Sequence, residues 1–254
     1  VYNGGCAPHV ILQMPIAGAA NVGDSLAAVK KVVFDEKKIT MEQLINALDA
    51  DFEGYEEIQH LLERAPKFGN DDDYVDFLLK DVLRYSCDYV KDRRSFGGAH
   101  FGTTILTLTA NVMFGRNVGA LPDGRKAGQP LAEGGISPYQ GRNVSGLTAT
   151  LKSVAKLDQV KLTNGSILNV RVSSDSVATE DKLHKLAMMV RTYCESGGNL
   201  VQFNFTSNEV LRAAQQRPED YRDLLVRVAT YSAFFVELGP ETQDDIIRRN
   251  EFSV

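Results

Sequence analysis

Cysteine is scarce in this chain of 254 residues, and its three cysteines, Cys6, Cys87 and Cys194, are widely separated. An odd number without a Cys-x-x-Cys pair excludes a disulfide framework and favours a reducing compartment. The sequence also lacks any run of about 18 apolar residues, the minimum for a membrane span. The apolar run from Val10 to Met14 lacks the basic start and cleavage pattern of a signal peptide. We therefore expect a soluble, cytoplasmic protein with no membrane partner.

Basic residues are not in excess. The formal net charge is −5 at pH 7, and the sequence pI is about 5.5. A general nucleic-acid binder needs a basic surface, so we expect no nucleic-acid partner. With 43% hydrophobic and 24% charged residues, the composition is that of a globular chain and excludes disorder and collagen-like repetition. The length suits one large domain or two modest ones.

Several common catalytic motifs are absent. The sequence contains no GxxxxGK[ST], GxSxG or HExxH motif, and the glycines at 97, 98 and 102 do not form GxGxxG. His60, His100 and His184 are dispersed without the pattern of a catalytic triad. The spacing of Cys6 and His9 permits two metal ligands, but no second pair completes a tetrahedral site. The sequence therefore predicts no metal centre.

Helical periodicity dominates the first hundred residues. Apolar residues recur at helical spacing after position 25, with Asn21 or Asp24 as the candidate cap. Thr40 and Gln43 form a capping-box pattern before a second helix, and a longer helix is predicted over residues 72–91. The carboxylates at 71–73 suit the positive end of its dipole. We favour capping over a metal cluster there, because adjacent carboxylates at a helix start point in different directions.

The second half of the chain alternates between helices and strands. Residues 115–141 contain seven glycines and three prolines, which predicts a long, ordered loop. After this loop we expect a helix over 147–157, a strand over 167–172, a helix over 179–195 and a strand over 200–205. A strand over 224–228 and a final helix opened by Gly239 and Pro240 complete an α/β pattern.

Two segments carry candidate binding residues. Leu-Pro-Asp-Gly-Arg at 121–125 is a tight-turn sequence that ends in Arg125, which is able to bind an anion or a carboxylate and is our candidate for a substrate contact. In the strand around 202–205, alternation places Gln202 and Asn204 on one face and the neighbouring phenylalanines on the other. In a barrel these amides would line a polar pocket, whereas in an open sheet they would face water.

Five ordered segments together resemble a known family. They are Gly-Asp-Ser-Leu at 23–26, Phe-Gly-Asn at 68–70, Pro-Asp-Gly-Arg at 122–125, Gln-Phe-Asn at 202–204 and Arg-Val-Ala-Thr-Tyr-Ser at 227–232. In this order they resemble the carboxy-terminal portion of the glycyl radical enzymes. The resemblance covers nearly the whole chain. It is closest to the branch of glycerol and diol dehydratases, choline lyase and pyruvate formate-lyase-like proteins.

The resemblance implies an α/β fold that forms part of a ten-stranded barrel, built from two five-stranded halves and surrounded by helices. Residues 1–115 would be a mostly helical part of the barrel domain, and residues 116–254 would be the glycyl radical region. In the family, a cysteine on one loop becomes a thiyl radical that attacks substrate, and a glycine on a second loop stores the radical. A separate iron–sulfur activating enzyme that uses S-adenosylmethionine installs the radical, so we expect this chain itself to bind no cofactor.

The chain departs from the family pattern first at the thiyl cysteine. The family's Gly-Cys-x-Glu type loop lies upstream of the matched region. Cys6 does not replace it, because Ala7 and Pro8 follow and no glutamate stands at the expected place. We therefore expect a fragment whose partner is the missing amino-terminal portion, or a partner chain that carries this cysteine. The family also implies a radical activating enzyme as a partner and a homo-oligomer.

The second departure is chemical. The family's radical motif is Arg-Val-x-Gly followed by Tyr or Phe, so here Thr230 stands at the radical glycine, with Arg227 and Tyr231 beside it. Glycine has no side chain, so its Cα can flatten and delocalise the unpaired electron, whereas a β-branched residue crowds a planar Cα and resists positive φ. Together with Gln202 and Asn204, which would face the substrate, these residues form the expected site.

The sequence thus predicts the carboxy-terminal part of a radical lyase or dehydratase that acts on a small organic substrate and is inactive as written. Two alternatives stay open. One is a non-catalytic regulatory or scaffolding relative, or pseudoenzyme. The other is a fumarate-adding member of the superfamily, which the unusual opening at residues 3–9 leaves possible.

Overall fold

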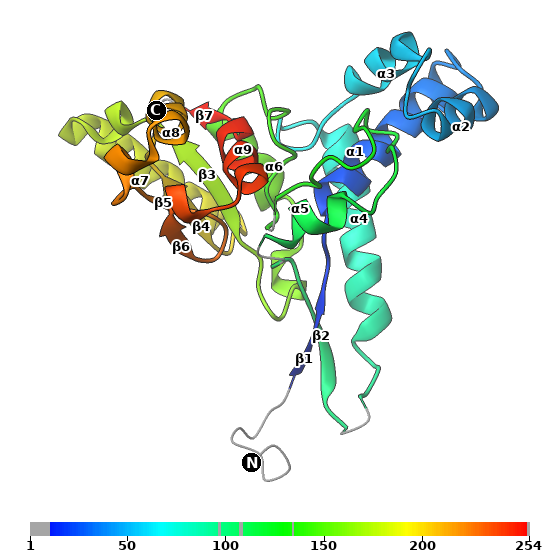
Figure 1. Cartoon of the computed structure of the whole chain (residues 1–254). Coiled ribbons are helices and arrows are strands. Elements are labelled where there is room, and N and C mark those ends of the chain that lie inside the picture. Colours follow the sequence, from blue (N-terminus) through cyan, green and yellow to red (C-terminus); the bar gives the residue numbers. More distant parts are fainter. Residues whose placement is uncertain (1–10, 96–97, 107–108, 134, 253–254) are drawn as a thin grey trace.

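The computed structural model describes residues 11–95, 98–106, 109–133 and 135–252, and within them the chain is a mixed α/β structure (Figure 1). The candidate metal ligands Cys6 and His9 lie outside the described residues. Most of the described residues before residue 116 are helical. The elements of this part are β1 (Ile11–Pro15), α1 (Ala19–Val29) with a π-helical extension (Lys30–Asp35), α2 (Met41–Asp49), α3 (Glu56–Glu63), α4 (Asp73–Val90), β2 (His100–Thr104) and α5 (Ala110–Gly115).

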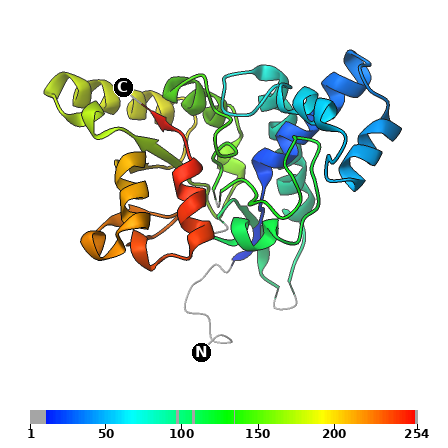
Figure 2. The same ribbon diagram turned by 45° about the horizontal axis from the view of Figure 1, so that its top comes forward.

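The part after residue 146 alternates between helices and strands. Its elements are α6 (Leu147–Ala155), β3 (Leu168–Val172), α7 (Glu180–Glu195), β4 (Val201–Asn204), α8 (Asn208–Gln216), β5 (Leu225–Arg227), β6 (Ser232–Phe234), α9 (Pro240–Arg248) and β7 (Glu251–Phe252), with four short 3-10 helices at Gln159–Lys161, Ser174–Val177, Pro218–Tyr221 and Phe235–Glu237. Helices α8 and α9 lie on the opposite side of the molecule from α2 and α3 (Figures 1 and 2). In the described part of the chain, every helix is too short or too polar to cross a membrane.

Local capping chemistry explains where several helices begin. The predicted capping box is confirmed: the Gln43 amide donates to Thr40 Oγ1 at 3.1 Å, and the Thr40 amide donates to Gln43 Oε1 at 2.8 Å. Helix α4 begins after Asp72, whose carboxylate accepts from the Tyr74 amide at 2.9 Å. The acidic cluster at 71–73 therefore caps a helix, as predicted, and its other two carboxylates form ion pairs with Lys156.

The predicted cap of α1 is wrong. The helix begins at Ala19, so Asn21 and Asp24 both lie inside it and are buried. Asp24 accepts from the Phe68 amide at 2.7 Å, and Asn21 donates to Asp123 at 2.7 Å. These two polar side chains therefore form hydrogen bonds with residues distant in sequence and do not cap their own helix.

The described strands form three small sheets. β1 and β2 pair in parallel from Ile11↔His100 to Pro15↔Thr104 and run beside α4 (Figure 1). β3 lies between β4 and β7 and pairs with both in parallel, whereas β5 and β6 form an antiparallel hairpin. The sequence predicted β3, β4 and β5 but missed β1 and β2, which are five-residue strands.

In the described ranges, buried apolar side chains form three clusters. The main core joins α1, α4, α6, α7 and β3, and includes Ala27, Leu79, Val154, Leu168 and Val172. A second core joins α1, α2 and α3. A third, which we call the hairpin core, joins α8, α9 and the β5–β6 hairpin, and consists of Leu211, Ala214, Val226, Val228, Phe235, Ile246 and Ile247. The main core and the hairpin core have no buried member in common among the described residues.

The first three of the five family-like segments meet in one buried polar network. Asp24 binds the Phe68 amide, and Asp123 accepts from Asn21. Arg142 lies between the two carboxylates, with Nη1 3.0 Å from Asp123 Oδ2 and 3.7 Å from Asp24 Oδ2. Contacts between segments distant in sequence thus explain why these motifs contain buried carboxylates.

Gly69 shows why the Phe-Gly-Asn segment needs a glycine. Its φ is +96°, a conformation that L-residues rarely adopt. A Cβ at this position would lie 2.3 Å from Pro138 Cγ, so the chain could not approach this closely with any larger residue.

The Arg125 side chain is buried and binds backbone carbonyl groups of its own loop. Only 1% of its surface is exposed. Its guanidinium donates to the carbonyl groups of Gly115 at 2.7 Å, Gly119 at 2.8 Å, Gln129 at 3.0 Å and Pro130 at 3.2 Å. The planar fork therefore holds together the predicted loop over 115–141, in which the described residues form no helix or strand beyond Gly115.

We expect Arg125→Lys to lower the free energy of unfolding by about 3 kcal/mol, because a lysine keeps the buried charge but cannot satisfy this ring of carbonyl groups. Urea denaturation measures the change. Arg116→Lys is the matched control, since Arg116 belongs to an exposed ion pair with Glu241 and its replacement should cost less than about 1 kcal/mol. Equal effects of the two substitutions would show that Arg125 is not the anchor of the loop.

Asp24 should give the fold a measurable pH dependence. Burial raises the pKa of Asp24 to about 7, against the opposing effect of Arg142. Because the folded pKa exceeds the unfolded one, the contribution of this group to stability is fully present below about pH 4 and is lost as the pH rises to 7. In the parent chain, the free energy of unfolding should therefore lose roughly 3 kcal/mol between pH 4 and pH 7 because of Asp24. Asp24→Asn should remove this loss.

Urea unfolding midpoints at pH 4 and pH 7 test this expectation. Asp81, an exposed carboxylate on α4, supplies the control substitution Asp81→Asn, which should leave the difference between the two pH values unchanged. An Asp24→Asn chain with the same pH dependence as the parent would contradict the assignment.

Candidate active site

The sheet formed by β3 and β4 has one apolar and one polar face. Val170 and Val172 are buried in the main core, and Phe203 packs against it. The parallel register pairs Asn169 with Gln202 and Arg171 with Asn204, so these four polar side chains share the opposite face. Alternation along two adjacent strands thus produces a continuous polar surface inside the molecule.

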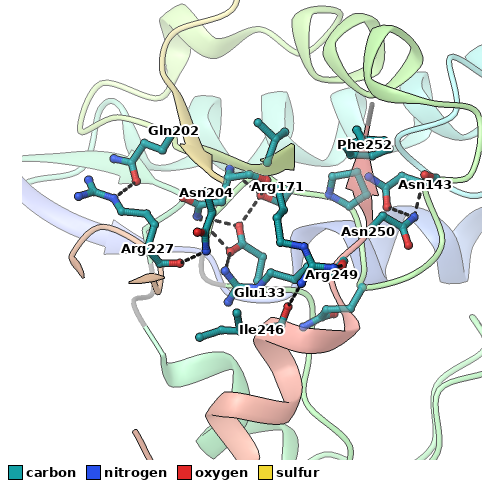
Figure 3. Close-up of a pocket in the computed structure, with 15 residues that line it drawn as sticks. Glu133, Asn143, Arg171, Gln202, Asn204, Arg227, Ile246, Arg249, Asn250 and Phe252 are labelled. Atoms are coloured by element: carbon teal, nitrogen blue, oxygen red, sulfur yellow. Dashed lines mark hydrogen bonds and ion pairs between the residues drawn. The ribbon is translucent and has the colours of Figure 1, made fainter. Parts of the chain in front are cut away.

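A small cavity lies over this polar face (Figure 3). Its volume is about 30 Å³, which is room for about two water molecules. Its walls come from the loop before α6, from β3, β4 and β5, and from α9, β7 and the residues between them. The lining residues are Glu133, Ser137, Pro138, Gln140, Asn143, Asn169, Val170, Arg171, Gln202, Asn204, Arg227, Ile246, Arg249, Asn250 and Phe252.

The structure brings three of the predicted site residues together. Arg227 Nε donates to Gln202 Oε1 at 2.8 Å, and Asn204 Nδ2 donates to the Arg227 carbonyl at 3.5 Å. Arg227 Nη1 also donates to Ser232 Oγ at 3.3 Å, within its own hairpin. The Gln-Phe-Asn and Arg-Val-Ala-Thr-Tyr-Ser segments, far apart in sequence, therefore meet at one edge of the cavity (Figure 3).

Thr230 lies in the turn between β5 and β6, which we call the radical-motif turn, residues 228–231. The Val228 amide donates to the Tyr231 carbonyl at 3.0 Å, so Ala229 and Thr230 are the two central residues. Thr230 is half-buried and Tyr231 is 38% exposed. Neither central residue has a positive φ, although two-residue hairpin turns prefer one or two such residues, most often glycine. The backbone at Thr230 is therefore in a conformation that L-residues adopt readily, and the turn itself does not require a glycine here.

Buried charges surround the cavity. Glu133 accepts from Asn169 Nδ2 at 2.9 and 3.0 Å and from the Ser137 hydroxyl, and it forms an ion pair with Arg249. Burial raises the pKa of the Glu133 carboxyl, and Arg249 opposes that shift. Arg171 Nη1 donates to the Ile246 carbonyl at 3.1 Å, and burial lowers the pKa of Arg171. The site is thus rich in fixed hydrogen-bond donors and acceptors.

Within the described residues, four polar atoms around the cavity are buried without a protein hydrogen-bond partner. They are two donors, Arg171 Nε and Arg249 Nε, and two acceptors, Asn169 Oδ1 and Gln140 Oε1. A pocket of this size with donors and acceptors on its walls suits ordered water, which satisfies buried polar groups in proteins.

Sequence reasoning missed Glu133, Arg171 and Arg249. Arg171 had a signal, because it stands between Val170 and Val172 in an apolar strand, where a charged residue needs a buried partner. Glu133 lies in the glycine-rich loop and Arg249 follows α9, where no periodicity indicates which way a side chain points. In contrast, Arg125 does not line the cavity, and its donors bind loop carbonyl groups.

Metal ligation has no support in the described residues, which contain no group of three histidine, cysteine or acidic side chains arranged to hold a metal ion. Cys87 is buried and Cys194 is exposed, and both are free thiols. The chemistry available at the cavity is therefore that of arginines, amides and carboxylates.

Comparisons with known proteins give a consistent result. Residues 1–115 match the family described as pyruvate formate lyase-like, and residues 132–236 match the family described as glycine radical. The chain is 41% identical to trans-4-hydroxy-L-proline dehydratase of Clostridioides difficile, covering 98% of this chain and 32% of that protein. It is 43% identical to isethionate sulfite-lyase of Desulfovibrio desulfuricans, covering 93% of this chain and 29% of that protein.

Solved structures agree. The glycerol-bound B12-independent glycerol dehydratase of Clostridium butyricum superposes with a TM-score of 0.95 at 44% identity, covering 98% of this chain and 32% of that one. The hydroxyproline dehydratase of Clostridioides difficile with substrate bound gives a TM-score of 0.94 at 40% identity. The chain therefore spans about a third of the length of the relatives that it matches. The two matched family regions and the shared fold confirm the resemblance of the five segments: this chain belongs to the glycyl radical enzymes.

Proposed function

We propose that this chain is the radical-storing part of a glycyl radical lyase or dehydratase, and that Thr230 prevents it from storing the radical. The observation that carries the proposal is the convergence of Gln202, Asn204 and Arg227 beside the radical-motif turn, with Thr230 at the centre of that turn. Everything around the turn follows the family-like pattern, and the residue that would carry the unpaired electron departs from it.

The chemistry of the Cα atom explains why threonine is unsuitable. Storage of the radical requires one Cα–H bond to break homolytically, with the hydrogen atom leaving to the radical of the activating enzyme. In the family, the hydrogen removed occupies the place where an L-residue carries its side chain. In Thr230 that place is taken by Cβ, so the abstractable hydrogen is missing. A β-branched side chain would also crowd the flattened Cα.

The proposed substrate is a small hydroxylated organic molecule that loses water or another leaving group. Relatives that match this chain are named for the dehydration of hydroxyproline and glycerol and for the release of sulfite from isethionate. The amides of Gln202 and Asn204 and the guanidinium of Arg227 offer hydrogen bonds of the kind that orient hydroxyl groups. We assign Tyr231, beside Thr230, to the same loop without a separate chemical role.

Turnover in this proposal also needs a part of the enzyme that supplies the thiyl cysteine, and an S-adenosylmethionine iron–sulfur enzyme that installs the radical. The share of each relative that the chain spans, about a third, supports a division of the active site between this chain and further sequence. In the described residues β1 pairs with β2 along one edge only, so its other edge is available to a further strand.

Thr230 itself favours a second candidate function. A non-catalytic relative that pairs with an active enzyme or with the activating enzyme would tolerate a threonine at this position, because it would never need to hold an unpaired electron. The two candidates differ in what a restored glycine should do.

Anaerobic incubation with a cognate activating enzyme, followed by electron paramagnetic resonance, tests the proposal. The chain as written should give no glycyl signal, whereas Thr230→Gly should give a doublet from coupling to the one remaining α-proton. Thr230→Ala is the matched control: it removes the bulk of threonine but keeps Cβ in place of the abstractable hydrogen, so it should also give no signal.

A doublet from the chain with Thr230 would refute the block at this position. A folded Thr230→Gly chain that yields no doublet, while the same activating enzyme activates a full-length relative, would favour the non-catalytic function.

A further inference from the structure

The guanidinium of Arg249 lies close to Glu133 of the loop before α6, just past the end of helix α9 (Figure 3), and it also contacts the radical-motif turn. Nη1 is 3.2 Å from Glu133 Oε2, and Nη2 is 3.0 Å from Asp245 Oδ2. The side chain of Arg249 is 14% exposed, and those of the two carboxylates are 2% exposed. Because little water reaches this cation, its position is determined by the protein groups around it.

The third contact of Arg249 is with the turn. Nη1 donates to the Val228 carbonyl at 2.6 Å. Val228 is fully buried, and its amide closes the turn by donating to the Tyr231 carbonyl at 3.0 Å. The backbone N–H of Val228 thus closes the turn, and its carbonyl oxygen connects the turn to the rest of the molecule by accepting from the Arg249 guanidinium.

Both carboxylates are themselves fixed to the body of the protein. Glu133 receives two hydrogen bonds from Asn169 of β3, at 2.9 and 3.0 Å. Asp245 accepts from Gln140 Nε2 and, at 3.5 Å, from Asn111 of α5. β3 and α5 therefore fix the two carboxylates, the carboxylates fix the Arg249 guanidinium, and the guanidinium holds the turn.

Packing alone does not determine where the turn lies. Val226 and Val228 belong to the hairpin core, whereas β3 and the partly buried Val201 and Phe203 of β4 belong to the main core. Apolar burial is non-directional and depends on area rather than register. Three polar contacts join the turn region to the sheet: Arg227 with Gln202, the Arg227 carbonyl with Asn204, and the Val228 carbonyl with Arg249, which is linked to β3 through Glu133.

We propose that Arg249 is a positioning residue that fixes the radical-motif turn over the polar face of β3 and β4 by holding the Val228 carbonyl. This inference rests on the proposed function only in treating the turn as the radical position. A lysine at 249 would keep the charge but, with a single ammonium group, could not bind both carboxylates and the carbonyl in one planar arrangement.

Hydrogen–deuterium exchange of the whole chain, resolved by mass spectrometry, tests the proposal without any radical. In Arg249→Lys, amides of residues 225–234 should exchange about tenfold faster than in the parent, because the turn opens locally. Residues 168–172 of β3 should be unaffected. Arg249→Met, which keeps length but loses the charge, should have the larger effect, so that lysine gives partial rescue.

Arg248→Lys is the matched control, because Arg248 is the adjacent residue, carries the same charge and is exposed. It should leave exchange in 225–234 unchanged. Equal exchange in the Arg248→Lys and Arg249→Lys chains would overturn the proposal. Acceleration of residues 168–172 to the same extent as 225–234 would also overturn it, because Arg249 would then stabilise the whole fold and not the turn.

Glu133→Gln offers a second variant in case Arg249→Lys fails to fold. It keeps the shape of the side chain but removes one of the two charges that hold the cation, so exchange in 225–234 should again rise, by a smaller factor. Unfolding of both variants would count against a local role.

A second measurement uses the absence of tryptophan from the chain. In a Tyr231→Trp background, acrylamide should quench the single tryptophan more strongly with Arg249→Lys than with Arg248→Lys. These outcomes are separable from failure of the proposed function, which would appear as a missing doublet in Thr230→Gly while the effect of Arg249 on exchange persists.

Discussion

A buried arginine between two carboxylates is the interaction on which the site depends. Arg249 connects Glu133 and Asp245 to the backbone of the radical-motif turn. Isolated buried ion pairs contribute little net stability, since the cost of desolvation offsets most of the Coulomb attraction, but the loss of one partner is expensive. Such an arrangement therefore adds little to the stability of the fold but fixes the position of the groups that it connects. A site for a reactive intermediate needs such fixed geometry.

The irregular loop before α6 makes polar contacts in two directions. Toward α1, the Ala132 backbone amide donates to Asn21 at 2.6 Å, and Arg142 binds Asp123. Toward the end of α9, Glu133 binds Arg249, and Asn250 donates to Asn143 at 2.9 Å. The family-like segments thus fall into two polar clusters, one around Asp123 and one around the cavity, and a single loop lies between them. A segment without regular structure can bind in two directions because its own backbone and side chains are not committed to a helix or a sheet.

The features that could be predicted from the sequence are those with local causes. The capping box at Thr40, the cap at Asp72 and the shared face of Gln202 and Asn204 depend on neighbours within four residues. The features that could not be predicted depend on distant partners. The sequence offers Asn21 or Asp24 as a helix cap, because periodicity cannot reveal the bond of Asp24 to the Phe68 backbone amide. The partners of Arg125 and Arg249 likewise depend on how the loop folds back. Family resemblance located the turn around Thr230, whereas the side chains that hold it became evident only in the structure.

The most direct test of the central claim, that residue 230 is the radical position, is isotopic. Thr230→Gly produced with α-deuterated glycine and activated anaerobically should show an electron paramagnetic resonance signal without the α-proton splitting, whereas the same chain with ordinary glycine should show the doublet. The chain with threonine at 230, which retains all its other glycines, should show neither signal. A splitting that survives deuteration, or an equal signal with threonine at position 230, would contradict the claim and place the unpaired electron on another residue.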